Sequence, residues 1–287
     1  MNRVQRRRFA QATAFALLAF ATFLILAIMV GIISFVASQG IGAISWEFLT
    51  AFPRSGMTEG GIFPAIVGTF YLAMGTTLIS LPLGVFAAIY LVEYSYQGRL
   101  IRLIRIGINN LAGVPSIVFG LFGLALFVRH LGLGVSLLSG SLTLAFFVLP
   151  LVIRASEEAL LAVPQGFREG ALALGATKWQ SVYTVVLPTA VPAILTGGIL
   201  ALGIAAGQTA PIIFTAAAFF TPRLPDSIFS PIMALPFHIY VMASESAHFA
   251  VTRHLQFGTA LVLLAIVFGI NITAIIIRSQ MRKRRRW

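Results

Sequence analysis

Residues 169–188 read EGALALGATKWQSVYTVVLP, and this stretch decides the fold because it interrupts a chain that is otherwise almost continuously apolar. It opens with an acidic residue, Glu169, and ends in Leu187-Pro188. Small residues follow the acid at Gly170-Ala171, and Gly175 lies about one helical turn further on. A short amphipathic segment between long apolar runs indicates a loop at a membrane surface.

The composition also indicates a membrane protein. Apolar residues make up 59% of the chain, charged residues only 10%, and the mean hydropathy is +0.96. A helix needs about 20 apolar residues to cross a bilayer core, and several charge-free runs reach that length without the alternation of a barrel strand. We therefore predict an all-α polytopic membrane protein with six transmembrane helices. The predicted spans are Phe9–Val36, Pro64–Leu91, Ile106–Val128, Leu131–Ile153, Val182–Ala206 and Gln256–Ile277.

The distribution of positive charge decides between six spans and seven, because the charge-free run 179–222 is long enough for two. With six spans and the N-terminus inside, all of the 20 lysines and arginines except Arg54, Arg129, Arg223 and Arg253 are cytoplasmic. Short cytoplasmic loops are enriched in Lys and Arg. Seven spans would place the basic C-terminal tail on the opposite side, so six spans with both termini cytoplasmic is the prediction.

The predicted organisation is one transmembrane domain, residues 9–277, between two basic cytoplasmic tails, residues 1–8 and 278–287. The net charge of +12 is concentrated at predicted membrane boundaries, where anionic headgroups attract Lys and Arg. It therefore indicates contact with the lipid bilayer and no nucleic-acid partner. The absence of cysteine excludes disulfides, thiolate metal sites and cysteine nucleophiles.

A compact pair of short helices is predicted in the loop at residues 154–181, between spans four and five. Ser156-Glu157-Glu158 suits a helix N-terminus, and Pro164 suits the first turn of a second helix. Gly175 is a typical helix end, and Thr177-Lys178-Trp179 opens span five.

Two interpretations of the second helix compete. Its residues divide between an apolar face, Phe167, Ala171 and Leu174, and a polar face, Gln165, Arg168 and Glu169. Such a helix can lie on lipid or in the groove of a soluble partner. A lipid-bound helix usually carries lysines and bulky apolar residues, whereas this segment carries Ala, Gly and Glu169. We favour a partner protein, whose backbone could approach the small residues closely.

The spacing of residues 169–188 resembles the EAA loop of ABC-importer permeases, through which an ATPase subunit grips the membrane subunit. Glu-Gly-Ala is followed after three residues by glycine, and after nine more by Val-x-Leu-Pro, with glycine where the pattern has its second-position alanine. The resemblance implies a set of ATPase-coupling residues: Glu169, Gly170, Ala171, Gly175, Leu187 and Pro188.

Residues 89–128, 149–180 and 207–217, with ALPFHIY at 234–240, resemble the PstA family, the permeases of the phosphate ABC importer. The resemblance implies the type I ABC importer permease fold, alternating access, and a prokaryotic plasma (inner) membrane. It also implies three partners: a second permease (PstC-like), an ATPase dimer (PstB-like) and an extracytoplasmic phosphate-binding protein (PstS-like). No GxxxxGK[ST] loop occurs, so we expect a non-catalytic subunit that binds no cofactor or metal, with ATP and Mg on the ATPase.

One departure from the family pattern affects the expected substrate. The family commonly has Arg-Ala-x-Gly-Glu-Thr-Ala-Pro before the last long loop, whereas here Ile204 and Gln208 replace the arginine and the glutamate. Losing both charges together leaves no unpaired charge in the membrane, and Gln208 keeps hydrogen-bonding groups. The substrate is then phosphate, another oxyanion or a small solute.

Polar residues in or beside the predicted spans are candidates for the translocation pathway. They are Asn109, Asn110, Ser116, Arg154, Gln208, Thr209 and Thr215. The two asparagines are equally compatible with hydrogen bonds between helices, and Arg154 is equally compatible with an ordinary membrane-boundary arginine.

An intramembrane enzyme and an ion channel are the other functions to weigh. No H-E-x-x-H or G-x-S-x-G motif occurs. The histidines, His130, His238, His248 and His254, lie in predicted extracytoplasmic loops, where we expect contact with water or with the binding protein. Asn, Thr and Gln could line a channel, but a channel needs no coupling loop. The proline-rich segment 207–255 is expected to pack on the outer ends of the helices or to dip partway into the membrane.

Overall fold

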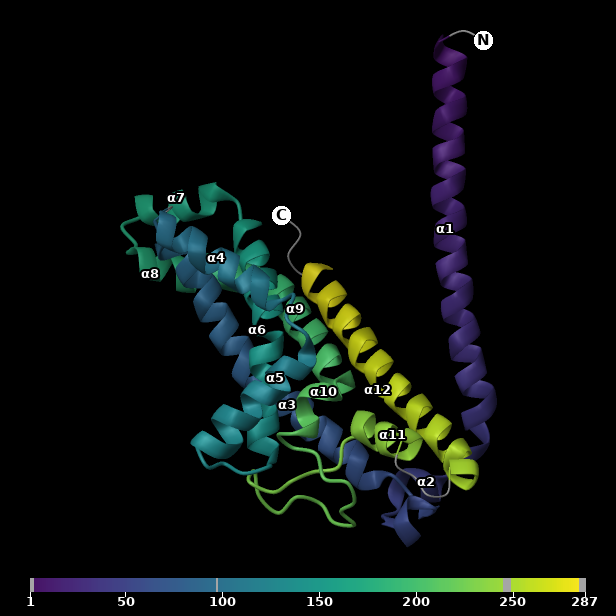
Figure 1. The fold of residues 1–287 in the computed structure, drawn as a ribbon. Helices are drawn as coiled ribbons and strands as arrows, with labels where there is room; N and C mark the ends of the chain where they lie inside the picture. Colours follow the sequence, from purple (N-terminus) through teal and green to yellow (C-terminus); the bar gives the residue numbers. More distant parts are fainter. Residues whose placement is uncertain (1–2, 97, 245–248, 284–287) are drawn as a thin grey trace.

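The computed structural model describes residues 3–96, 98–244 and 249–283, which form a helical bundle with one long helix standing apart (Figure 1). The helices are α1 (Arg3–Gly40), α2 (Trp46–Thr50), α3 (Phe63–Ile89), α4 (Arg99–Leu111), α5 (Ser116–Gly123), α6 (Leu137–Leu161), α7 (Gln165–Ala173), α8 (Lys178–Ser181), α9 (Leu187–Gly207), α10 (Ala210–Ile213), α11 (Leu235–Ser244) and α12 (Phe249–Lys283). Wider π-helical turns extend α3 through Tyr94, extend α5 through His130 and join α8 to α9.

A short 3-10 turn at Ile41–Ala43 precedes α2, and a second one at Ser55–Met57 connects the strands of a small hairpin. Its strands β1 (Pro53–Arg54) and β2 (Glu59–Gly60) pair antiparallel, with Pro53 opposite Gly60. Among the described residues, five helices are long and apolar enough to cross a membrane, and α4 with α5 passes the same test as a pair. This confirms the predicted all-α polytopic membrane fold.

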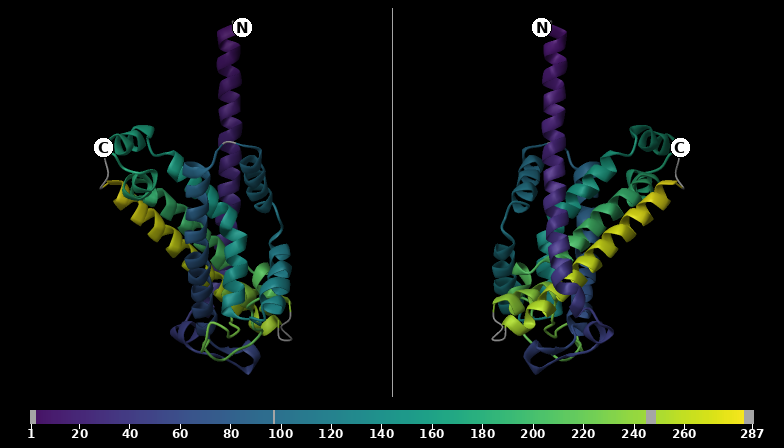
Figure 2. Two further views of the ribbon diagram at one scale, coloured as in Figure 1. Left: turned by 90° about the vertical axis from the view of Figure 1, so that its left-hand side faces the viewer. Right: turned by 90° about the vertical axis from the view of Figure 1, so that its right-hand side faces the viewer.

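The two ends of the bundle differ in what they carry (Figures 1 and 2). We call one the termini end, since it carries both chain termini with α7 and α8, and the other the loop end, which carries α2 and residues 214–234. Helix α1 leans away from the bundle, and Gly40 at its C-terminal end lies against the backbone of Phe257 in α12. The apolar side chains along α1 are exposed, as expected for a helix surrounded by lipid or by other membrane helices.

Small residues let the central helices α3, α6 and α9 pack closely. A β-carbon on Gly84 of α3 would lie 2.6 Å from Val152 of α6, and one on Gly75 would lie 2.5 Å from Ser141. The two pairings advance together along the chain, so α3 and α6 run parallel. Gly197 of α9 lies in the same way against Ala155 of α6. Close approach through small residues is how membrane helices gain packing contacts without a hydrophobic driving force.

At the loop end, residues 214–234 pack against the N-terminal end of α6. The backbone N–H groups of Ser136, Leu137 and Leu138 donate to carbonyls of that segment, each at 2.9 Å. These are donors that the first turn of a helix cannot satisfy internally. Helix α11 docks beside them, because the Leu235 N–H donates to the Thr69 hydroxyl on α3 at 2.8 Å. The segment therefore packs on the helix ends, as expected.

His238 corrects the expectation that the loop histidines contact water or a binding protein. It lies on α11, a ten-residue helix outside the candidate spans, and is only 4% exposed. Desolvation by burial lowers its pKa to about 4, so the imidazole is neutral at pH 7. His130 and His254 are exposed, and His248 lies outside the described residues.

The third predicted span, Ile106–Val128, is wrong as a single straight helix. The chain bends by 102° between α4 and the helix that starts at Ser116. Pro115 precedes that start and has no N–H to continue a helix. Span four also begins later than predicted, at Leu137, after a turn in which Gly132 and Gly134 have positive φ.

Helix α6 is longer than the sequence indicated. The predicted helix start at Ser156-Glu157-Glu158 is wrong, since these residues lie inside α6, which continues to Leu161. Ser156 and Glu157 are buried there, whereas Glu158 is exposed. One short helix, α7, therefore lies between the end of α6 and the start of α8, where a pair of short helices was predicted.

Replacing Gly84 with leucine tests the packing of α3 on α6. The added side chain has no room beside Val152, and overpacking of this kind costs roughly 1–3 kcal/mol. We expect Gly84→Leu to lower the unfolding free energy in SDS-titrated micelles by that amount. Gly31→Leu is the matched control, because a β-carbon on Gly31 meets nothing within 4 Å. Equal effects of the two substitutions would contradict the close α3–α6 contact.

Candidate coupling site

The segment that joins α6 to α9 forms a compact projection at the termini end (Figure 1). Pro164 is the N-cap of α7, as the sequence predicted for a helix start at this point. The Gly175 N–H donates to the Leu172 carbonyl at 3.0 Å, and the Ala176 N–H donates to the Ala171 carbonyl at 3.1 Å. This pair of bonds is a Schellman motif, which requires a left-handed residue after the helix. Gly175 has φ +85°, so the predicted helix end is confirmed.

The chain turns directly into α8. The Thr177 N–H donates to the Gln180 side chain at 2.7 Å, and the Gln180 N–H donates to the Thr177 hydroxyl at 3.3 Å. This reciprocal capping box confirms the predicted start of the next helix at Thr177-Lys178-Trp179. The following π-helical turn, Val182–Val186, lies just before Pro188, whose missing N–H breaks the regular helical ladder.

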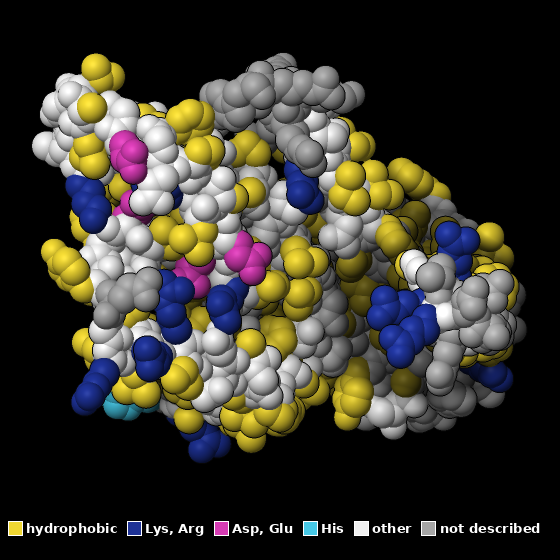
Figure 3. Space-filling model, turned by 90° about the horizontal axis from the view of Figure 1, so that it is seen from above, with side chains coloured by type: hydrophobic (Ala, Val, Ile, Leu, Met, Phe, Trp, Pro, Cys, Tyr) yellow, Lys and Arg dark blue, Asp and Glu magenta, His cyan; other side chains and the backbone are white. Residues whose placement is uncertain are grey.

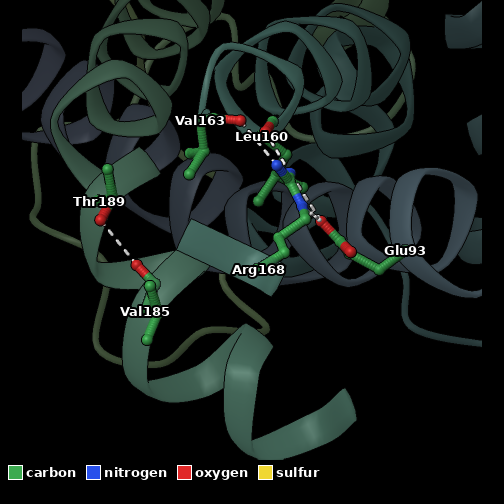
Figure 4. Close-up of polar contacts among 6 residues, drawn as sticks. All are labelled: Glu93, Leu160, Val163, Arg168, Val185 and Thr189. Atoms are coloured by element: carbon green, nitrogen blue, oxygen red, sulfur yellow. Dashed lines mark hydrogen bonds and ion pairs between the residues drawn. The ribbon is translucent and has the colours of Figure 1, made fainter. Parts of the chain in front are cut away.

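Arg168 fastens α7 to the ends of two long helices (Figure 4). Its Nε and Nη2 donate to Oε1 of Glu93, beyond the end of α3, at 3.0 and 2.9 Å. Nη1 donates to the Val163 carbonyl at 2.6 Å, and Nη2 donates to the Leu160 carbonyl at 2.8 Å. Leu160 is in the last turn of α6 and Val163 lies two residues beyond the helix, where backbone carbonyls have few helical partners. We call Arg168, Glu93 and the two carbonyls the Arg168 clamp.

The clamp is largely shielded from water. The side chain of Arg168 is 18% exposed and that of Glu93 is 8% exposed. Beneath it lies an apolar cluster from α3, α6 and the turn before α9, with Phe167 and Leu187 at its edge. Removing one partner from such a pair leaves a poorly solvated charge behind, so these helix ends and α7 are held as one unit.

A second ion pair holds α4 at the same end of the bundle. Arg105 Nη1 lies 3.1 Å from Oε1 of Glu157 in α6, and Arg105 Nη2 donates to the Leu91 carbonyl at 3.1 Å. Neither ion pair was predicted, because each joins residues from different spans. The only sequence signal is that Glu93 and Arg105 adjoin apolar runs, at 60–92 and 106–128.

The outer face of α7 is open. Glu169 and Gly170 are exposed, while Phe167 and Ala171 are half-buried toward the bundle. Leu174, the third residue of the predicted apolar face, is 91% exposed and does not share the half-buried position of the other two. The reason is that α7 ends at Ala173 and Leu174 forms its C-cap.

A cavity of about 630 Å³ lies between α7 and the neighbouring helix ends. Its charged lining consists of Glu93, Arg168, Glu169 and Lys178. Seen from the termini end, acidic and basic side chains adjoin on this face, with hydrophobic side chains around them (Figure 3). Such a hollow with an exposed acid and small residues beside it can receive a complementary protein surface.

The structure places the predicted coupling residues in two groups. Glu169, Gly170 and Gly175 are exposed, with Ala171 half-buried beside them. Leu187 and Pro188 instead begin α9 and are half-buried. Near them the Thr189 hydroxyl donates to the Val185 carbonyl at 2.7 Å (Figure 4). This second group therefore belongs to the start of α9 and contributes little to the accessible surface of the projection.

The candidate pathway residues are spread over three helices, the α9–α10 break and the turn after α10. Asn109 and Asn110 are exposed at the end of α4, and Arg154 is exposed on α6. Ser116 opens α5, and Gln208 and Thr209 are half-buried at the break between α9 and α10. Helix α5 packs against the start of α10, because a β-carbon on Gly120 of α5 would lie 2.9 Å from the Ala210 carbonyl. Their role in translocation stays a prediction.

Thr215 does not line an open path in this conformation. It is fully buried, and its hydroxyl donates to the Pro211 carbonyl at 2.9 Å. Its methyl group would lie 2.9 Å from a β-carbon on Gly123 of α5. A short residue at this position lets the two segments pack together.

Comparison with known proteins agrees with this geometry. Residues 80–286 match the family described as the binding-protein-dependent transport system inner membrane component. The chain is 38% identical over 229 residues to the probable ABC transporter permease protein YqgI of Bacillus subtilis, covering 76% of this chain and 78% of that protein. It is 37% identical over 227 residues to the phosphate transport system permease protein PstA 1 of Mycobacterium tuberculosis, covering 79% and 72%.

Solved structures show the same fold. A chain of a bacterial alginate ABC transporter, in complex with an alginate pentasaccharide-bound periplasmic protein, superposes with a TM-score of 0.66. It is 14% identical and covers 95% of this chain and 96% of its own. A chain of the inward-facing MetNI methionine ABC transporter superposes with a TM-score of 0.58 at 22% identity, covering 76% and 94%.

The family match shows that the chain is a membrane-spanning permease subunit of an ABC importer, and the solved structures show that it has the type I fold. Within that class the chain belongs to the PstA family, several members of which are 33–37% identical to it over most of its length.

Replacing Arg168 with glutamine tests the clamp. The substitution leaves the poorly exposed Glu93 carboxylate without its charge partner, and we expect a loss of roughly 3 kcal/mol of unfolding free energy. Glu93→Gln should have a similar effect, and the double variant should cost much less than the sum of the two. Glu158→Gln, one residue along from buried Glu157 but exposed, is the control and should be neutral. Additive single effects would contradict the pairing.

Replacing either of two glycines of the same segment with alanine should change amide exchange in α7, in opposite directions. Gly175→Ala forces a β-carbon into a left-handed conformation at about 1–2 kcal/mol, so amide exchange across α7 should accelerate about fivefold to thirtyfold. Gly170→Ala lies in the helix with open space around the new β-carbon, so exchange should slow by up to about fivefold. Hydrogen-exchange mass spectrometry measures both. Acceleration in both variants would show that α7 is not ordered as described.

Proposed function

We propose that this chain carries inorganic phosphate across a bacterial inner membrane, driven by ATP hydrolysis on a separate subunit. The observation that carries the proposal is α7, which presents Glu169 and small residues outward while the Arg168 clamp anchors it from behind. A lipid-lying helix needs no such anchor to the ends of two spans. The phosphate permeases among the relatives support the substrate.

The termini end is proposed to be cytoplasmic. It carries Arg99, Arg102 and Arg105 on α4 and Lys178 on α8. Arginine and lysine are enriched in the short loops on the cytoplasmic side of a membrane. The partners proposed there are a pair of ATPase subunits. A second, related permease completes the pathway, and a phosphate-binding protein docks at the loop end. The alginate transporter structure, which includes a substrate-loaded periplasmic protein, supports this last partner.

The mechanism follows from the anchoring of α7. When the ATPase pair closes on ATP, a displacement of α7 is passed through Arg168 to Glu93 and to the end of α6. Because α3 and α6 pack through glycines, they tilt together. The tilt opens the pathway to one side of the membrane and closes it on the other, as in alternating access. The chain itself performs no catalysis in this scheme.

The substrate is selected mainly outside this chain. Ile204 packs beside an apolar cluster of α6 and α9, and Gln208 supplies a neutral polar group at the α9–α10 break. Neither position offers a charge to hold an anion. A weakly polar path favours release over retention, so the binding protein provides most of the selectivity.

Uptake of labelled phosphate tests the substrate. Vesicles with the full set of subunits, with and without this chain, are assayed with arsenate, sulfate and molybdate as competitors. We expect uptake that depends on the chain and is blocked by arsenate alone. Intact assembly without phosphate uptake would keep the permease function and assign another solute.

Glu169→Lys tests the coupling surface. Reversing this exposed charge should abolish ATPase assembly or separate ATP hydrolysis from uptake, while membrane insertion stays normal. Gln165→Lys is the control, because it adds a positive charge at another exposed position of α7. The readout is ATP hydrolysed per phosphate taken up. Normal coupling in the Glu169 variant would refute the role of this surface.

A further inference from the structure

Helix α4 carries a strip of positive charge that the proposed function does not use. Arg99, Arg102 and Arg105 recur at every third position along one side of the helix. Arg105 is neutralised by Glu157. Neither Arg99 nor Arg102 has an ionic partner among the residues that the structure describes, and both are exposed.

These arginines border a cavity of about 600 Å³ between α4 and the ends of α3 and α6. Besides the three arginines, the lining includes the Ser95 side chain and Gly98, the N-cap of α4. Among the residues that the structure describes, no acidic side chain lines it. The Ser95 hydroxyl already donates to the Leu91 carbonyl at 2.6 Å, so the guanidinium groups of Arg99 and Arg102 are the donors that this hollow provides for the oxygens of a phosphate group.

The same helix exposes an apolar side next to the arginines. Leu100 is 69% exposed, Leu103 is 65% exposed and Ile104 is 38% exposed. Helix α4 lies on the outside of the bundle at the termini end (Figure 2), and it bends by 102° away from the direction of α5. A helix at the edge of a membrane protein with one cationic and one apolar side is typical of the bilayer interface.

We propose that the cavity beside α4 binds the headgroup of an anionic phospholipid. The phosphate and its negative charge lie against Arg99 and Arg102, and the acyl chains cover Leu100 and Leu103. A free oxyanion satisfies the arginines but gives no reason for the neighbouring leucines, so the lipid is the occupant that both observations fit. Each arginine near an anionic surface contributes about 1 kcal/mol, which for two arginines is roughly a thirtyfold change in affinity.

Native mass spectrometry of the full-length chain with phosphatidylglycerol or phosphatidylcholine tests the site. We expect phosphatidylglycerol to be retained in preference to phosphatidylcholine. The double variant Arg99→Gln/Arg102→Gln should lose about thirtyfold of that preference. The matched control, Arg7→Gln/Arg8→Gln, removes two exposed charges from α1 at the same end and should retain it. Equal losses in the two double variants would overturn the specific site.

A second comparison separates the lipid from a free ion. Leu103→Asn leaves every arginine in place, so it should weaken phosphatidylglycerol and leave any binding of inorganic phosphate unchanged. Millimolar inorganic phosphate should not displace the lipid. Displacement by inorganic phosphate, together with normal lipid binding by Leu103→Asn, would overturn the lipid site and assign the arginines to a free oxyanion.

Discussion

The four bonds of the Arg168 guanidinium are the contact on which the rest of the termini end depends. The last carbonyls of α6 have no partners within their own helix, and Glu93 is a carboxylate with little access to water. One planar side chain satisfies both, because guanidinium presents several donors in fixed directions. Lysine could not reach the same set of acceptors. The position of α7 is therefore determined by electrostatics more than by its own apolar contacts, which are few.

This anchoring explains how so small a helix can move a large bundle. Membrane helices are held by packing and not by exclusion of water, and here α3, α6 and α9 meet through glycines with almost no free space. A closely packed group of helices transmits displacement because its interior does not compress. The helical path is interrupted outside this group, at the 102° bend before Pro115. Movement of α7 is then expected to rotate the group as one body.

Much of the coupling segment could be predicted from the sequence, because its signals are local. Pro164, Gly175 and Thr177 act within one or two helical turns, and each marks a boundary that the structure confirms. Hydropathy found the long spans for the same reason. It did not distinguish a helix that crosses the membrane from one lying beside the bundle, so α4 was merged with α5. The regular spacing of Arg99, Arg102 and Arg105 was the sequence signal that could have separated α4 from the span.

The missed contacts are the ones that depend on tertiary structure. Glu93 and Arg168 are separated by 75 positions in the chain, and no local pattern relates them. Charge counting placed Arg105 at the surface, although it pairs with buried Glu157. The helix start expected at Ser156 failed because capping residues also occur inside helices when their side chains are buried between neighbours. The pathway residues have no local signal of their own, because a polar side chain in a span can equally bond to a neighbouring helix.

The most direct test of the central claim is a distance between α7 and the end of α3 in the working transporter. The chain has no cysteine, so in the double variant Leu174→Cys/Tyr90→Cys the spin labels attach at these two positions only. Both positions are exposed. Pulsed electron paramagnetic resonance then gives their separation with and without ATP. If Arg168 joins α7 to the bundle, one narrow distance distribution is expected in both states, and it should broaden when Arg168→Gln is added. A distance that shifts between nucleotide states by more than the width of the distribution, with transport intact, would contradict the coupling of α7 through Arg168.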